Sequence, residues 1–185
     1  MTTLSIIAIF ALIKTPELLI KARKLWNGAP EYFFHDAASS SGKYHPAFDL
    51  GEGGTYRHSL LVAYFAHEGA LAQGLPQRMI DICTAAALLH DLWKRGFEGG
   101  EHTAFEHPLY AASYVREAFP GDEDMELVAS AIESHMGKWN TSKYSDAVLP
   151  LPMTQVQCIV SMADMIASRK ILSELSKAET WDTGC

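Results

Sequence analysis

The segment that most constrains the fold is the apolar run Ala85 to Leu89, which is followed directly by His90 and Asp91. A run this apolar belongs in a protein core, so the His and Asp at its end enter the core with it. Burying such a pair is costly unless each side chain is hydrogen-bonded, ion-paired or bound to a metal. Neighbours on a helix lie about 100° apart, so both side chains can reach one pocket between them. The segment therefore predicts a core helix that ends at a buried polar site.

Other residues of the same kind lie beside apolar helical segments. Asp164 falls in the most apolar part of the last predicted helix, and an Asp in a core helix is rarely fully buried without a partner. His58 and His107 lie in the first turns of predicted helices, and His135 closes another. One histidine alone is more often a core or surface residue than a ligand, but five such helices favour a shared metal site. The candidate metal ligands are His58, His90, Asp91, His107, His135 and Asp164.

Imidazole and carboxylate ligands suit manganese, iron, cobalt, nickel or zinc. A carboxylate can bridge two such ions, and two-metal sites clamp the attacking and leaving oxygens of phosphoryl transfer. No cysteine belongs to the set, which argues against a structural zinc site. Cys83, Cys158 and Cys185 are scattered along the chain and indicate a reduced intracellular protein, which we expect in the cytoplasm.

Helical periodicity dominates the chain and strand-like alternation is absent, so we predict an all-α fold with an antiparallel helical core. The 185 residues indicate a single domain over 1–185, with a metal-binding core at about 50–175 and an N-terminal helical segment at about 4–27. The irregular stretches 31–54 and 137–152 are long enough to be functional, as a lid or a substrate rim. Predicted helices cover 4–26 (as one or two helices), 55–73, 77–94, 103–119, 122–136 and 154–177.

The net charge of −7 argues against tight, sequence-independent binding to a long duplex, which usually needs a basic face. Small phosphorylated substrates stay compatible with it, because a metal centre supplies positive charge locally. The apolar segment from Leu4 to Ile13 is too short to span a bilayer and has no basic residues before it. We therefore expect no membrane role, and we regard this segment as a candidate interface in a homo-oligomer.

Read in order, His58, the His90-Asp91 pair, His107, His135 and Asp164 resemble the six-ligand, dinuclear pattern of the HD-domain superfamily over about residues 50–175. The doublet alone is a weak signal, but the full ordered set on predicted helices is a strong one. The resemblance implies an HD-domain helical bundle and a metal-dependent phosphohydrolase that uses a metal-bound hydroxide as nucleophile. It also implies that His58, His90 and Asp164 hold one divalent ion, that His107 and His135 hold a second, and that Asp91 bridges them.

The same resemblance assigns catalytic roles to Asp91 and Lys94, because many HD proteins place a phosphate-contacting lysine shortly after the doublet. A solvated lysine at a helix end is the plainer alternative for Lys94. Lys43, Lys138 and Arg169 are further candidates for phosphate contact, and Trp139 is a candidate for stacking on a base or for the core. Many relatives read His-Asp-x-Gly-Lys, whereas this chain has Trp93 in place of the glycine, which bears on substrate fit rather than on the metals.

Two short segments, Gly53-Gly54-x-x-x-His58 and Ser134-His135-Met136-Gly137-x-x-Asn140, are similar to the HD domains of bacterial three-prime exoribonucleases. The expected substrate is therefore a small phosphorylated compound: a phosphomonoester or phosphodiester of a nucleotide, or a short single-stranded nucleic acid. Two alternatives stay open. Some HD proteins with this ligand set are diiron oxygenases, and a third type keeps the metals without catalysis, as a sensor or for stability.

The remaining histidines separate into three groups. His67 lies nine residues after His58, two and a half helical turns away, so it points away from the candidate site. His35 and His102 occur in loop-like sequence and are expected at the surface. His45, in the long loop, is a candidate for lining the site.

Overall fold

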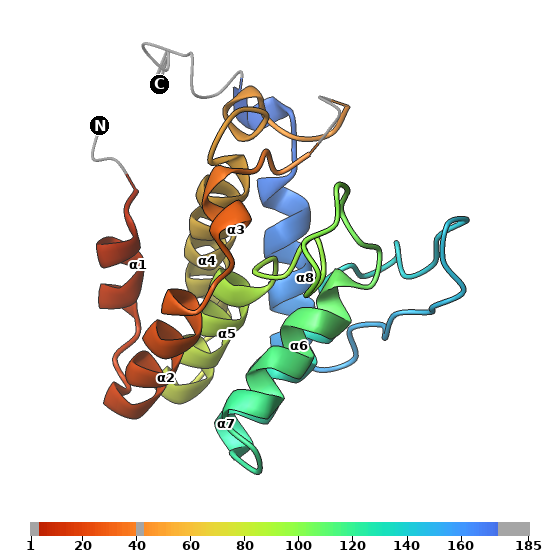
Figure 1. The fold of residues 1–185 in the computed structure, drawn as a ribbon. Helices are drawn as coiled ribbons and strands as arrows, with labels where there is room; N and C mark the ends of the chain where they lie inside the picture. Colours follow the sequence, from red (N-terminus) through yellow and green to blue (C-terminus); the bar gives the residue numbers. More distant parts are fainter. Residues whose placement is uncertain (1–3, 40–42, 174–185) are drawn as a thin grey trace, which may run out of the picture.

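The structure is a computed structural model that describes residues 4–39 and 43–173; Cys185 lies outside these residues. Within the described residues every regular element is a helix, which confirms the predicted all-α class (Figure 1). The elements are α1 (Ile6–Leu12), α2 (Pro16–Asn27), α3 (Glu31–His35), the 3-10 helix η1 (Ala47–Asp49), α4 (Gly54–Ala72), α5 (Gln77–Leu89), α6 (His107–Ala118), α7 (Glu123–Glu133) and α8 (Gln155–Ala167).

Helix α5 is the centre of the fold. Every residue from Ile80 to Leu89 is buried, and the helix contacts α1, α2, α4, α7 and α8. The small side chains of Ala85 to Ala87 allow these neighbours to approach closely. Figure 1 shows α5 between α4 and the α6–α7 pair, with α1 and α2 on the outer side. The burial of the run before His90 agrees with the expectation that this end of the helix lies in the core.

Helix starts agree with the sequence better than helix ends. The hydroxyl of Thr154 accepts a hydrogen bond from Gln157 N in a reciprocal capping box, and Asp122 accepts one from Met125 N. The prediction that the central helix reaches residue 94 is wrong, because the backbone after Leu89 changes to tight turns, with Leu92 N bonded to Leu89 O at 3.3 Å. The predicted last helix is likewise interrupted after Ala167, where Arg169 N bonds Ile166 O, and its predicted residues 174–177 lie outside the described residues.

The described residues of the stretch 31–54 are more regular than the composition suggests, since they contain α3 and η1. Its backbone is bonded to itself and to the start of α4: Gly53 N donates to His35 O at 2.9 Å, and Thr55 N donates to Asp36 O at 2.8 Å. The stretch 137–152 contains no helix and only one isolated bridge, between Ser142 and Ser145. Among the described residues, no helix combines the length and the apolar character needed to cross a membrane.

Candidate metal centre

Five helices bring six polar side chains together at one end of the bundle. His58 is on α4, the His90-Asp91 pair follows α5, and His107 is the first residue of α6. His135 lies just after α7, and Asp164 is on α8. All are buried except Asp164, whose side chain is 19% exposed. Their nitrogen and oxygen atoms form overlapping groups of three, and within each group the atoms lie within 4.8 Å of one another. One of these groups consists of His90, His135 and Asp164.

The first half of the cluster consists of His58, His90 and Asp164. His58 Nε2 lies 3.0 Å from Asp164 Oδ1, and His90 Nε2 lies 3.9 Å from the same oxygen. Atoms bound to one ion at about 2.0–2.2 Å lie about 3 Å apart, so these separations are close to those of a shared ion.

The second half consists of His107 and His135, and Asp91 lies between the halves. Asp91 Oδ1 is 3.1 Å from His107 Nε2 and 3.9 Å from His135 Nε2. Asp91 Oδ2 instead faces His90 Nε2, at 3.5 Å, and the ammonium of Lys94. The two carboxylate oxygens therefore face different histidines, which is the arrangement that a bridging carboxylate requires.

The hydrogen bonds of three histidines leave lone pairs directed into this cluster. Nδ1 of His90 lies 2.6 Å from Ala87 O, Nδ1 of His107 lies 2.8 Å from Ala104 O, and Nδ1 of His135 lies 2.7 Å from Ile132 O. A carbonyl only accepts, so each neutral ring carries its proton on Nδ1 and presents Nε2 as a lone pair.

These lone pairs fit a bound cation. Nε2 of His107 and Nε2 of His135 are only 3.2 Å apart, and neither has a proton to share. Nε2 of His90 has no hydrogen-bond partner within the described residues. Buried acceptors facing one another are unfavourable on their own and favourable around a positive ion. The donor set, imidazole nitrogens with carboxylates, is one that divalent first-row metals take.

The electrostatics keep most of these groups in their metal-binding forms. Burial, reinforced by the charges of His90 and His107, lowers the pKa of His135 to about 3. Burial also lowers the pKa of His90. Burial alone would raise the pKa of Asp91, but the nearby Lys94 and His90 hold it well below its usual range. His58 is the exception: burial disfavours its charge, yet the carboxylates of Asp164 and Asp49 raise its pKa to about 9.

All members of the cluster except His90 line a cavity of about 370 Å³, a size suited to a small ligand. Lys94 and Arg169, both expected to contact phosphate, line it, and so does Trp139. The remaining lining residues are Ala38, Ser39, Tyr44, His45, His58, Asp91, Thr103, His107, His135, Met136, Asp164, Met165 and Ser168.

Two other candidate phosphate contacts are not part of this lining. The ammonium of Lys43 lies over the ring of Tyr44 at 5.0 Å, and that of Lys138 lies over Trp139 at 4.7 Å. The exposed lysines thus pack on the outer sides of aromatic residues that do line the cavity. Trp93, the departure from the glycine pattern, points away from the cavity and packs on Phe97 and Tyr114.

The other histidines lie as their sequence contexts indicate. His67 is buried away from the cluster, with Nδ1 3.3 Å from Thr84 Oγ1, and His35 and His102 are exposed. His45 lines the cavity. The residue that the sequence did not identify is Asp49, which is fully buried behind His58. The only sequence feature that points to a buried Asp49 is its position between two apolar residues, Phe48 and Leu50, in a stretch that otherwise looks like a loop.

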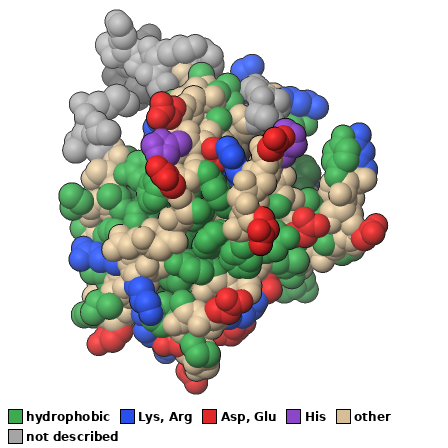
Figure 2. Space-filling model, in the orientation of Figure 1, with side chains coloured by type: hydrophobic (Ala, Val, Ile, Leu, Met, Phe, Trp, Pro, Cys, Tyr) green, Lys and Arg blue, Asp and Glu red, His purple; other side chains and the backbone are tan. Residues whose placement is uncertain are grey.

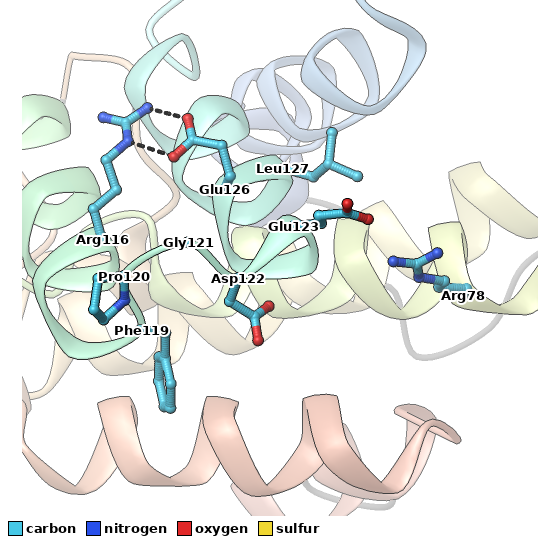
Figure 3. Close-up of a pocket in the computed structure, with 9 residues that line it drawn as sticks. All are labelled: Arg78, Arg116, Phe119, Pro120, Gly121, Asp122, Glu123, Glu126 and Leu127. Carbon is cyan, nitrogen blue, oxygen red and sulfur yellow. Dashed lines mark hydrogen bonds and ion pairs between the residues drawn. The ribbon is translucent and has the colours of Figure 1, made fainter.

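A second hollow lies at the connection between α6 and α7, away from the cluster (Figure 3). Most of its charged side chains are paired: Arg116 bonds Glu126 at 2.8 Å and also Glu133, and Arg78 bonds Asp124 at 2.6 Å. Paired surface charges of this kind carry no free ligand-binding chemistry. The face drawn in Figure 2 likewise mixes acidic, basic and apolar side chains over the described part of the chain.

Comparison with known families gives one match. The sequence model of the HD domain family matches residues 55–169, from the start of α4 to Arg169, and this segment contains all six side chains of the cluster. Searches of curated proteins and of solved structures found no match.

Proposed function

The chain belongs to the HD domain family, and from that premise we propose that it hydrolyses a phosphomonoester or phosphodiester of a nucleotide or short oligonucleotide. Metal-dependent hydrolysis is the general activity that the family indicates. In this proposal His58, His90 and Asp164 hold one divalent ion, His107 and His135 hold a second, and Asp91 bridges the two.

The observation that carries the proposal is a cavity lined both by imidazole rings whose Nε2 lone pairs face inward and by the positively charged side chains of Lys94 and Arg169. When bound, divalent ions supply positive charge that polarises the phosphate and activates a water molecule. The chain's own contribution is to orient the substrate. Lys94 and Arg169 line the cavity and would contact the phosphate oxygens. Trp139 and Met136 offer apolar surface on which a base could stack.

The test is a screen of nucleotides, short oligonucleotides and a nitrophenyl phosphodiester against several divalent metals, with Asp91→Ala as the blank. We expect turnover by the wild type without dioxygen and none by the variant. Protein purified anaerobically with two irons per chain, and active only with dioxygen, would contradict hydrolysis and favour the diiron oxygenase class instead.

A further inference from the structure

The histidines of the cluster are oriented in two different ways. His90, His107 and His135 lie at helix ends, where the carbonyl three residues earlier is near enough to accept from Nδ1. His58 lies inside α4, and the helix itself uses the carbonyls before it. The ring of His58 therefore needs another partner to hold its proton on Nδ1.

Asp49 is the group that faces this nitrogen. Its Oδ2 lies 3.5 Å from Nδ1 of His58, on the side of the ring opposite Asp164. Asp49 is fully buried, and neither of its oxygens has a hydrogen-bond partner within the described residues. Its ion-pair contacts with His58 and His45, at 3.5 and 3.7 Å, are longer than hydrogen bonds, so the retention of a buried carboxylate here calls for an explanation.

The backbone around Asp49 is held firmly against the start of α4. Asp49 O accepts a hydrogen bond from Ala38 N at 2.9 Å, and Arg57 Nε donates to Phe48 O at 2.8 Å. Gly54 packs so closely that a Cβ there would lie 2.0 Å from Asp49 O. Asp49 is thus fixed about one helical turn from His58. The same oxygen, Asp49 Oδ2, also lies 3.7 Å from Nδ1 of His45, a residue that lines the cavity.

We propose that Asp49 is a positioning residue of the metal centre: its carboxylate keeps the His58 proton on Nδ1 and the ring turned so that Nε2 is the metal-binding atom. The inference rests on the proposed metal centre. Carboxylates that orient a metal-bound histidine in this way are a general feature of metal sites, and their loss weakens the metal. His45 completes the arrangement by holding Asp49 from the cavity side.

The experiment measures metal affinity rather than turnover. Wild type, Asp49→Asn, Asp49→Ala and Asp81→Asn are stripped of metal and titrated with Co²⁺ in competition with a chromogenic chelator. Asp81 is the matched control, because it is also fully buried but lies near the other end of α5. Thermal unfolding of each metal-free protein reports its folding separately.

We expect Asp49→Ala to weaken Co²⁺ binding by about 10–100-fold, the usual cost of removing such a partner. Asp49→Asn keeps an acceptor oxygen and should lose less, and both should change the visible absorption of the bound cobalt. The metal-free Asp49→Asn protein should melt somewhat lower than the wild type, because it loses the ion pair with His58, but it should stay folded at the temperature of the titration. Asp81→Asn should melt lower and bind Co²⁺ normally.

Three outcomes would overturn the inference. If the wild type binds Co²⁺ and Asp49→Ala binds it equally well with the same spectrum, Asp49 positions nothing. If His45→Ala removes one bound cobalt per chain, the His45–Asp49–His58 group is itself an ion site. If the wild type binds no metal, the proposed metal centre fails, and this inference fails with it.

Discussion

Helix α5 has a buried aspartate near each end, and the two are held in opposite ways. Asp81 accepts hydrogen bonds from the backbone N–H groups of Lys14 and Thr15, at 3.1 and 2.7 Å, and from the Thr15 hydroxyl at 2.7 Å. Asp91 instead faces the rings of His90, His107 and His135. Nε2 of His90 has no hydrogen-bond partner among the described residues.

The contrast distinguishes an aspartate that is buried to stabilise the fold from one that is buried, in the proposed function, to bind metal. The carboxylate of Asp81 satisfies backbone groups that would otherwise be orphaned, so it ties the α1–α2 connection to the core. The Asp91 end collects more acceptors than donors, which is favourable only when a cation is present. If the proposed function is correct, one helix carries a site for stability and a site for chemistry, and mutations at the two ends should have different consequences.

The largest effect should come from Asp91→Ala. In the proposed metal centre Asp91 bridges the two ions, and its loss would remove metal catalysis worth several kcal/mol, so kcat/KM should fall about a thousandfold or more. Turnover of a nitrophenyl phosphodiester with Mn²⁺ measures this, and circular dichroism checks that the variant is folded. The exposed Asp146→Ala should behave as the wild type. An active Asp91→Ala protein would contradict the proposed catalytic role of Asp91.

Asp81→Ala should show the opposite behaviour. Two backbone N–H groups lose their acceptor, which should lower the free energy of unfolding by about 3 kcal/mol. For a chain of this size, the melting temperature should fall by about 6–12 °C. Below that temperature kcat/KM should stay at the wild-type value. A stable but inactive variant would show that the two ends of α5 are not independent.

Lys94→Met should reduce activity without emptying the site. The ammonium lines the cavity beside Asp91, and removing one such charge from a phosphoryl-transfer site should lower kcat/KM about a hundredfold. Metal content, measured by elemental analysis, should be retained. Lys143→Met is the matched control, because Lys143 is exposed and lies over Tyr144. Equal activities in the two variants would leave Lys94 as a structural ion-pair partner of Asp91.

The smallest effect is the stabilisation by metal itself. At a free Mn²⁺ concentration ten times its Kd, the free energy of unfolding should rise by about 1.4 kcal/mol. Calorimetry of the metal-free and metal-loaded proteins gives this increment. The Asp81→Ala variant should gain the same amount from its lower baseline, and Asp91→Ala should gain less. An equal gain in Asp91→Ala would place the stabilising ion elsewhere.

The sequence predicted the core and the cluster because both leave local patterns. Apolar periodicity marks α5, and a His or Asp beside an apolar run marks a buried polar site. Asp49 left no such pattern. It is buried by close backbone packing against Gly54 and Ala38, and the periodicity of side chains does not record such an approach. The sequence also missed two helix ends. After Leu89 and Ala167 the side chains keep a helical pattern, but backbone N–H groups bond carbonyls three residues earlier, as in tight turns.

The direct contact between His58 on α4 and Asp164 on α8 joins residues 106 apart in the chain. A protein is made from its N-terminus, so α4, α5, α6 and α7 are all synthesised before Asp164 is added. Until then the nascent chain has its four histidines and Asp91 but lacks the carboxylate that closes the first half of the cluster. The complete set of six therefore exists only after α8 has been synthesised and has docked. All six side chains can bind metal together only after that step.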